Sequence, residues 1–286
     1  MTSGARRILL AILLLIAASI ASACATKEES GSDAGDAAAA TSHVHGIAPG
    51  PAGGALIATH DGLYRVNRKA GSPELVGDNR HDLMGFTQAG RNRYVASGHP
   101  DPRDTRLPPN LGVVESHDQG RTWNGIAFYG EGDFHVLEAQ GKYVYGYDGQ
   151  SGLLRSTSGG RRWREHVPPD EIISLAISPR SPKQLIAASP SGLSTSTTGG
   201  ARWRQLRPDI AGMLTWPAPD RLFLVDPAGT VHLSRNGGRA WEQVGRLGGS
   251  PTAFEAVGAD LYAGLQDGSV RRSTDAGATW SVAATF

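Results

Sequence analysis

A repeat of about 40 residues constrains the fold of this chain more than any other feature. Five segments share the pattern S-x-[DNST]-x-G-x-x-W, in which a serine is followed by a short polar side chain, a glycine and a tryptophan. The segments begin at Ser116, Ser156, Ser196, Ser234 and Ser273, so successive serines are 40, 40, 38 and 39 residues apart. A single match would mean little, but five in register indicate an array of equivalent structural units.

Each segment predicts a turn between two strands, which we call a repeat turn. The short polar side chain accepts backbone hydrogen bonds inside the turn, and the glycine adopts a positive φ without strain. The tryptophan begins the next strand and offers apolar surface to a neighbouring unit, so we expect the tryptophans at equivalent, mostly buried positions. The residues predicted to be structural are Asp118, Gly120, Trp123, Gly160, Trp163, Gly200, Trp203, Gly238, Trp241, Asp275, Gly277 and Trp280.

Short apolar segments surround every repeat turn, with three before it and one after it. In one unit the three segments are residues 133–138, 143–147 and 153–156. Four short strands per repeat, with many glycines and no long helical period, are typical of a β-propeller blade. The sequence therefore predicts an all-β fold, a six-bladed β-propeller. Its first strands are expected to start near His43, Asp82, Asp133, Glu171, Ile210 and Thr252.

The ends of the array are less regular than its middle. The first unit has no repeat turn, and its third strand at 63–67 leads into a degenerate turn around Gly71. The last strand is expected at 280–286, and no strand exchange between the first and last blades is apparent. A seventh blade built from unusual sequence remains open as an alternative to six.

The N-terminus has the features of a bacterial lipoprotein signal peptide. Arg6 and Arg7 precede an apolar run, residues 8–21, that is too short for an ordinary membrane-spanning helix. Small residues at 21–23 precede Cys24, the sole cysteine. We expect residues 1–23 to be removed and Cys24 to carry lipid on the outer side of the cytoplasmic membrane. The alternative is ordinary secretion, with cleavage near Ala23.

The composition of the remaining chain sets the domain boundaries and excludes some classes of partner. Residues 24–41 comprise the lipidated cysteine and a small, polar stretch, which is expected to be a flexible tether. Residues 42–286 are expected to form the propeller. Without Arg6 and Arg7 the chain has 26 basic against 27 acidic residues and no basic stripe, so nucleic acid is not an expected partner. One cysteine excludes an intrachain disulfide.

The repeats resemble the Asp-box, or bacterial neuraminidase repeat, superfamily over nearly all of residues 43–286. That superfamily includes sialidases, the sortilin ectodomain and photosystem II stability factors. A narrower resemblance, to bacterial lipoproteins labelled sialidase-like or glycosyl hydrolase, is carried by HVHGI (43–47), THDGLYRV (59–66), MGF (84–86), ASGHPD (96–101), PNLG (109–112) and DFH (133–135). The resemblance implies a propeller and suggests a glycosyl hydrolase, but a shared fold does not establish a shared activity.

The catalytic residues of sialidases do not carry over to this sequence. Sialidases use an arginine triad, a tyrosine–glutamate pair and an aspartate acid/base, and their Arg-Ile-Pro element near the first blade is replaced here by HVHGI (43–47). Tyr147 lies beside Asp148, but no matching glutamate and arginine set is apparent. Whether the chain is an enzyme therefore stays undecided at this stage. For glycoside hydrolysis, the candidate carboxylates are Asp82, Asp133, Asp148 and Glu255.

Propeller topology predicts where a functional site would lie. The starts of the first strands and the loops between second and third strands fall on one face, here called the top face, and the repeat turns fall on the opposite face. Six of the nine histidines map to the top face within the first three blades. The candidate ligand or metal residues there are His43, His45, His60, Asp82, Met84, His99, Asp101, Asp133, His135 and Asp148.

These side chains allow three interpretations. Alternate residues of a strand point the same way, so His43 pairs with His45, Asp82 with Met84, and Asp133 with His135. Imidazoles with carboxylates suit zinc or another divalent transition metal, and a methionine would favour copper. The same groups suit a metal-free ligand site or general acid/base catalysis. Alternatively, they are ordinary solvated loop residues.

Two functions follow as hypotheses. The first is an envelope-anchored, extracytoplasmic propeller that binds a ligand, a metal ion or a partner protein on its top face. The second is a sialidase-like glycoside hydrolase acting on an extracellular glycan. The expected partners are the membrane, through the N-terminal lipid, and a protein or glycan ligand. A proline-rich insertion at 99–110 is expected to lie on the top face, where Arg103 and Arg106 would offer anion contacts.

Overall fold

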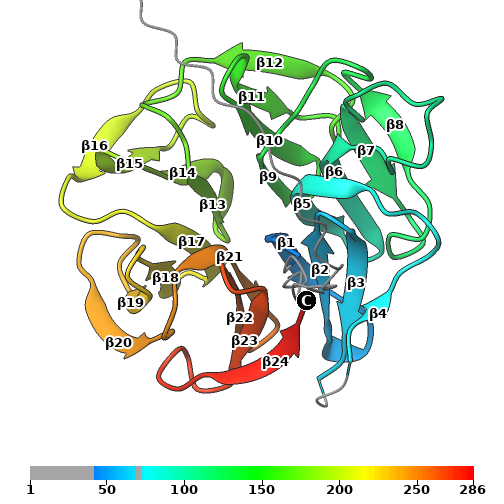
Figure 1. Cartoon of the computed structure of the whole chain (residues 1–286). Helices are drawn as coiled ribbons and strands as arrows, with labels where there is room; N and C mark the ends of the chain where they lie inside the picture. Colours follow the sequence, from blue (N-terminus) through cyan, green and yellow to red (C-terminus); the bar gives the residue numbers. More distant parts are fainter. Residues whose placement is uncertain (1–41, 69–71) are drawn as a thin grey trace, which may run out of the picture. The chain divides into compact units, whose positions relative to one another are not determined.

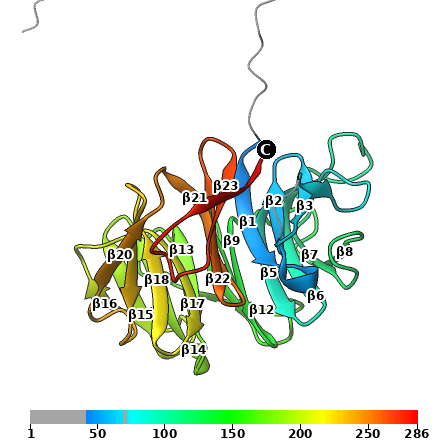
Figure 2. The ribbon, with the colours of Figure 1, turned by 90° about the horizontal axis from the view of Figure 1, so that it is seen from below.

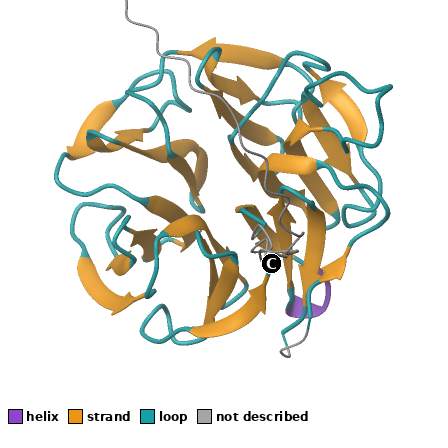
Figure 3. Cartoon of the chain, viewed as in Figure 1, coloured by secondary structure: helices purple, strands orange, loops and turns teal. Residues whose placement is uncertain are grey.

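The computed structural model describes residues 42–68 and 72–286, and these residues form a ring of six four-stranded antiparallel sheets (Figures 1 and 3). The predicted all-β, six-bladed propeller is confirmed. The predicted signal peptide, Cys24, the predicted tether and the predicted turn around Gly71 lie outside the described residues. Within those residues a single short 3₁₀ helix, η1 (Pro51–Gly53), interrupts the strands. No described helix is long and apolar enough to cross a membrane.

The strands follow the chain in order, four to a blade. Blade 1 contains β1 (Val44–Pro49), β2 (Ala55–Thr59), β3 (Gly62–Val66) and β4 (Glu74–Leu75). Blade 2 contains β5 (Asp82–Gly90), β6 (Arg93–His99), β7 (Val113–Ser116) and β8 (Asn124–Ala127). Blade 3 contains β9 (Val136–Gln140), β10 (Tyr143–Asp148), β11 (Gly152–Ser156) and β12 (Trp163–His166).

The other three blades repeat the arrangement. Blade 4 contains β13 (Ser174–Ser178), β14 (Ser181–Ser189), β15 (Gly192–Ser196) and β16 (Arg204–Arg207). Blade 5 contains β17 (Met213–Ala218), β18 (Arg221–Val225), β19 (Thr230–Ser234) and β20 (Glu242–Arg246). Blade 6 contains β21 (Pro251–Val257), β22 (Asp260–Leu265), β23 (Ser269–Ser273) and β24 (Ser281–Thr285).

The first strands of blades 3, 4 and 5 begin three residues later than expected, at Val136, Ser174 and Met213. Blade 3 shows the physical reason. The backbone N–H of Phe134 donates to Ser97 Oγ of blade 2 at 3.0 Å instead of to a strand of its own blade. Phe134 is almost fully buried there, so the residues before β9 join blade 3 to blade 2.

The apolar core is divided among the gaps between blades rather than gathered at one centre. Six clusters of buried side chains fill the six gaps between neighbouring blades. The first strands β1, β5, β9, β13, β17 and β21 surround a central channel (Figure 1). The stability of each blade therefore depends on burying apolar side chains against both of its neighbours.

Among residues 42–68 and 72–286 the ring closes without strand exchange, because each sheet contains only consecutive strands. At the seam, β1 packs against β21. The buried carboxylate of Asp260 in blade 6 accepts hydrogen bonds from Arg272 at 2.6 Å and from Arg68 of blade 1 at 3.0 Å. The ring of Phe286 lies edge-on to that of Tyr64, 5.1 Å between centroids. Side chains, not backbone ladders, hold the first and last blades together.

The five repeat turns share one hydrogen-bond pattern. In each, the serine hydroxyl accepts the N–H of the glycine four residues later, at 2.8–3.1 Å. In four of them the tryptophan Nε1–H donates to the carbonyl of that glycine at 2.7–3.0 Å. The five tryptophans occupy equivalent positions but are half-buried, whereas we expected them mostly buried.

The repeat-turn glycine has two physical roles. Its φ lies between +83° and +90° in all five turns, a region that favours glycine. It also lies against the preceding blade: a Cβ on Gly120 would be 2.1 Å from Leu63 Cδ2 in β3 of blade 1. A side chain at this position would therefore push two blades apart as well as strain the turn.

The variant Gly120→Ala should lower the free energy of unfolding by about 2–4 kcal/mol, because it adds overpacking to the cost of a positive φ. Gly141→Ala is the matched control. Gly141 also has a positive φ, +62°, but a Cβ there would meet nothing within 4 Å, so only about 1–2 kcal/mol should be lost. Chemical denaturation measures both values. Equal losses would show that contact with blade 1 is unimportant.

Candidate functional site

The six histidines assigned to the top face lie in first strands, just before them, or at the ends of second strands. His43 precedes β1, His45 lies in β1 and His60 lies in the β2–β3 turn. Since neighbouring strands are antiparallel, these positions share a face, and the repeat turns lie on the other. Figure 2 shows the strands running between the two faces. His81, His99 and His135 occupy the corresponding places in blades 2 and 3.

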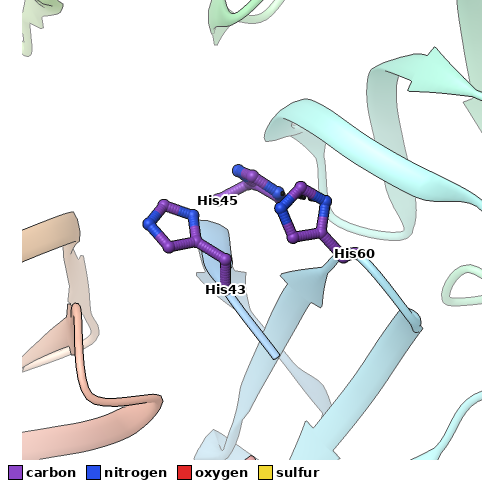
Figure 4. A group of neighbouring side chains, drawn as sticks. All are labelled: His43, His45 and His60. Carbon is purple, nitrogen blue, oxygen red and sulfur yellow. Dashed lines mark hydrogen bonds between the residues drawn. The ribbon is translucent and has the colours of Figure 1, made fainter. Parts of the chain in front are cut away.

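The structure brings His43, His45 and His60 together (Figure 4). One ring nitrogen from each lies within 4.8 Å of the other two. The ring centroids of His45 and His60 are 4.2 Å apart, and those of His43 and His45 are 5.0 Å apart. Three imidazoles within reach of one point form a cluster that we call the histidine triad.

Local backbone features hold the histidine triad in place. β1 pairs with β2 through Val44 opposite Thr59 and Gly46 opposite Ala58, so His45 is the extra residue of a β-bulge. A bulge redirects a side chain that regular alternation would place elsewhere. Thr59 accepts the N–H of Asp61 at 3.1 Å and fixes the turn that carries His60. The backbone N–H of His60 also donates to the carbonyl of His43 at 3.3 Å.

Asp82, the first residue of β5, joins the histidine triad from blade 2. Its Oδ2 lies 2.8 Å from His60 Nδ1, and its Oδ1 lies 3.4 Å from His45 Nε2. The two nitrogens are themselves 3.1 Å apart. β1 reaches this close to β5 because residue 46 is glycine, whose Cβ would lie 2.9 Å from Phe86 Cβ. Two imidazole nitrogens and a carboxylate therefore crowd around one point.

Electrostatics keep the buried imidazole of the histidine triad neutral at physiological pH. The pKa of His45 is lowered to about 4, chiefly by burial and also by the charges of His60 and His43, against the opposing carboxylate of Asp82. Burial is also the largest cause of the lowered pKa of His43. A neutral imidazole has a free lone pair, which is the form that binds metal ions.

A second group on the top face contains His99, Asp133 and His135. Asp133 Oδ2 lies 3.1 Å from His135 Nε2 and 3.7 Å from His99 Nε2. His99 Nδ1–H donates to the carbonyl of Pro109 at 3.0 Å, which leaves Nε2 directed toward Asp133. The charge of His135 contributes to lowering the pKa of His45, so the two groups are neighbours.

Of the remaining predicted residues, Asp101 and Asp148 have other partners, and Met84 shares only a cavity with His45 of the histidine triad. The carboxylate of Asp101 is occupied by Arg103, whose Nε–H donates at 2.9 Å and which lowers the pKa of Asp101 far below its usual range. Asp148 accepts two backbone N–H groups and borders a cavity of about 600 Å³ together with Asp133 and His135. Met84 borders a smaller cavity at the mouth of the channel.

The arginines of the insertion do not have the role that we expected. Arg103 pairs with Asp101, and Arg106 Nε–H donates to Asp104 at 2.9 Å. Both guanidinium groups are therefore engaged by carboxylates of their own loop. These pairs brace the insertion, and the expectation of anion contacts through Arg103 and Arg106 has no support in the geometry.

Sequence reasoning named Glu255 as a candidate carboxylate but missed Glu138, its partner in a carboxyl pair inside the channel. Glu138 of β9 and Glu255 of β21 border the same two cavities. Thr215 Oγ1 donates to Glu255 Oε1 at 2.7 Å, and the N–H of Ala256 donates to it at 2.8 Å. Burial raises the pKa of Glu255 to about 7, and burial with the charge of Glu255 raises that of Glu138. The two glutamates occupy equivalent positions in the first strands of their blades. An alignment of the blades would have shown this equivalence and could have identified the pair.

No protein-family model matches the sequence, and no curated protein matches it either. Solved structures share its fold. YCF48 bound to a D1 peptide is 17% identical, with a TM-score of 0.52 over 85% of this chain and 82% of that one. A GH74 xyloglucanase from Xanthomonas campestris is 15% identical, with a TM-score of 0.56 over 85% of this chain and 45% of the enzyme.

A third similar structure is virginiamycin B lyase from Staphylococcus aureus with quinupristin, which is 12% identical, with a TM-score of 0.56 over 86% of each chain. At such identities the likeness establishes the fold alone. The chain is a six-bladed β-propeller protein, and its neighbours in fold space include both binding proteins and enzymes. Its own chemistry has to be inferred from its own residues.

The channel carboxyl of Glu255 should make stability fall as pH rises. The folded pKa of about 7 lies above the unfolded value of about 4.3. The folded state therefore binds more protons between these values, and the stability contributed by the neutral form is present at pH 4 and lost by pH 7. Glu255→Gln, which keeps an acceptor for Thr215, should remove this loss.

As pH rises from 4 to 8, the wild type should lose stability that Glu255→Gln keeps. The free energy of unfolding of the variant should therefore rise by about 1–3 kcal/mol relative to that of the wild type over this range. Urea denaturation at several pH values measures this difference. Glu165→Gln, at an exposed position of β12, is the control. Parallel pH profiles for Glu255→Gln and the wild type would contradict the assignment.

Proposed function

We propose that this chain is an extracytoplasmic, lipid-anchored propeller that binds a divalent transition-metal ion on its top face. The ligands are His43, His45 and His60, and Asp82 completes the site. The observation that carries the proposal is the convergence of three imidazole nitrogens within 4.8 Å of one another beside a carboxylate.

The distances among these atoms support a metal site, because they are close to those between the ligands of one metal ion. Ligand atoms about 2.0–2.1 Å from a tetrahedral zinc lie about 3.3 Å from one another. The separations among His45 Nε2, His60 Nδ1 and the Asp82 oxygens are 2.8–3.4 Å. Asp82 Oδ1 is buried and accepts no hydrogen bond from the described residues. A cation between these atoms satisfies both nitrogens and the carboxylate at once.

The burial of His45 favours a metal over a proton at this position. A buried imidazole with a pKa of about 4 resists protonation down to acidic pH, so protons compete weakly with the metal. Asp82 supplies a negative charge that offsets part of the metal's charge and orients His60. Zinc, copper and nickel all accept imidazole with carboxylate.

The cellular location is part of the proposal and rests on the N-terminal sequence. Arg6 and Arg7, the apolar run 8–21 and the small residues before Cys24 support export followed by lipid attachment. The ring would then be held outside the cytoplasmic membrane with its top face available for a metal or a protein. The peptide complex of YCF48, a protein of similar fold, supports a protein ligand as a second kind of partner.

The variant His60→Ala should weaken Zn²⁺ binding at pH 7 at least tenfold, because it removes one of three imidazoles. His60 lies in an exposed turn, so the fold should persist. Isothermal titration calorimetry with ZnCl₂ measures the affinity, and His117→Ala, at an exposed repeat-turn position on the other face, is the matched control. Wild-type protein that binds no zinc, copper or nickel, or equal affinities for both variants, would overturn the metal site.

Hydrolysis of an extracellular glycan is the second candidate, favoured by one observation. Asp133, Asp148 and Tyr147 border one polar cavity of about 600 Å³, large enough for sugar units. A glycan panel with Asp133→Asn as the inactive control separates this function from metal binding. Release of sugar by the wild type but not by the variant would favour the hydrolase.

Membrane association provides an independent test of the anchor. Cys24→Ala should shift the full-length protein from the detergent-extracted membrane fraction to the soluble fraction, since it removes the sole thiol that can carry lipid. Fractionation with immunodetection measures the distribution. If Cys24→Ala leaves the protein bound to the membrane as before, the lipoprotein assignment is wrong.

A further inference from the structure

One side chain from every blade borders a cavity of about 130 Å³ at the mouth of the central channel. The six residues occupy equivalent positions at the start of the first strands or just before them: His45, Met84, His135, Ile173, Met213 and Thr252. We call this set the mouth ring. The polar and sulfur-bearing members lie mainly in blades 1, 2, 3 and 5.

The backbone directs several of these side chains by the same device. In β5, Leu83 pairs with Gly98 and Gly85 with Ser97, so Met84 is the extra residue of a bulge. In β1 the extra residue is His45, and in β21 it is Thr252. A bulge redirects the side chain of its extra residue. The same irregularity thus recurs at one ring position in three blades.

The methionines of this ring are distinctive in the sequence. The chain has three methionines, and the two that follow Met1 both belong to the mouth ring. Core filling is the usual role of methionine. Within the described residues, however, Met84 packs with none of the six interblade clusters, while Met213 packs only against the margin of the cluster between blades 5 and 6. Both side chains are half-buried.

The chemistry of the mouth ring differs from that of the histidine triad. Thioethers are soft, uncharged ligands that select Cu(I) over zinc, whereas imidazoles with a carboxylate accept zinc, nickel and Cu(II). Two imidazoles adjoin the sulfur side chains, His45 from blade 1 and His135 from blade 3, on either side of Met84. Ile173 and Phe254 contribute apolar groups to the border of the cavity, which Glu138 and Glu255 also line.

We propose that the mouth ring is a Cu(I) site, formed by the thioethers of Met84 and Met213 with the imidazole of His135, and adjoining the histidine triad through His45. This inference rests on the proposed metal-binding function, and it identifies copper as the metal that the top face binds. Binding involves no change in the oxidation state of the ion. Two sites of different softness next to one another allow each oxidation state of copper to be held.

The test compares Cu(I) and Zn²⁺ binding by the full-length protein in detergent. Met84→Leu and the double variant Met84→Leu/Met213→Leu keep side-chain volume and apolarity, so they should fold. Cu(I) affinity is measured under anaerobic, reducing conditions by competition with a chromophoric Cu(I) chelator. Zn²⁺ affinity is measured by calorimetry, and Ile173→Leu, in the same ring without sulfur, is the matched control.

The double variant should bind Cu(I) at least tenfold more weakly than the wild type, with unchanged Zn²⁺ affinity, and Ile173→Leu should behave as the wild type. Unchanged Cu(I) affinity in the double variant, with Zn²⁺ still bound by the wild type, would overturn the copper site and leave the proposed metal-binding function intact. A wild type that binds neither ion would overturn both. Equal losses for both ions would also overturn the copper site, since thioethers would then not discriminate.

Discussion

The contact between each repeat-turn glycine and the blade before it is the constraint on which the rest of the propeller depends. The serine hydroxyl binds the glycine N–H at 2.8–3.1 Å and holds the turn in a shape with positive φ. The bare Cα then lies against an apolar side chain of the preceding blade, as Gly120 lies against Leu63. A local hydrogen bond thereby sets the distance between blades, and with it the packing of the interblade clusters.

The candidate site lies where the blades depart from regularity. The histidine triad is built from a bulge in β1, a threonine-braced turn and a glycine that admits β5. Blades 4 to 6 have fewer such bulges and close approaches between first strands. None of the candidate histidines of the top face lies in these three blades. The regular parts of the repeat therefore maintain the ring, while the irregular first strands direct ligands to the mouth of the channel.

The sequence predicts the fold well because the repeat turn is a local structure. Serine, glycine and tryptophan at fixed spacing determine the turn by hydrogen bonds within eight residues, so five of the six blades follow from counting the turns. The first blade has no repeat turn and is predicted from its strands alone. The first strands of blades 3 to 5 begin three residues later than predicted. In blade 3 the reason is that the backbone of Phe134 bonds to Ser97 of another blade. Such a contact depends on how blades stack, which no local pattern contains.

The sequence predicted on which face the candidate site lies, but not which residues form it. Topology alone placed the histidines on one face. Asp133 does lie beside His135, although both precede β9 and strand alternation is not the cause. The bulge at His45 and the pairing of Asp101 with Arg103 were not visible in the sequence. Glu138 escaped notice because a single glutamate in a strand looks like any solvated carboxylate. Only the closed ring of six blades places Glu138 in the channel with Glu255.

The absence of strand exchange among the described residues affects the order in which the molecule assembles. Every blade consists of four strands that are contiguous in the chain, so all the strands of a blade are present as soon as its last strand has been synthesised. His43, His45, His60 and Asp82 lie within the first blade and the first residue of the second. The histidine triad is therefore complete early in synthesis. The mouth ring contains one residue from each blade. It is therefore complete only when all six blades have closed into the propeller.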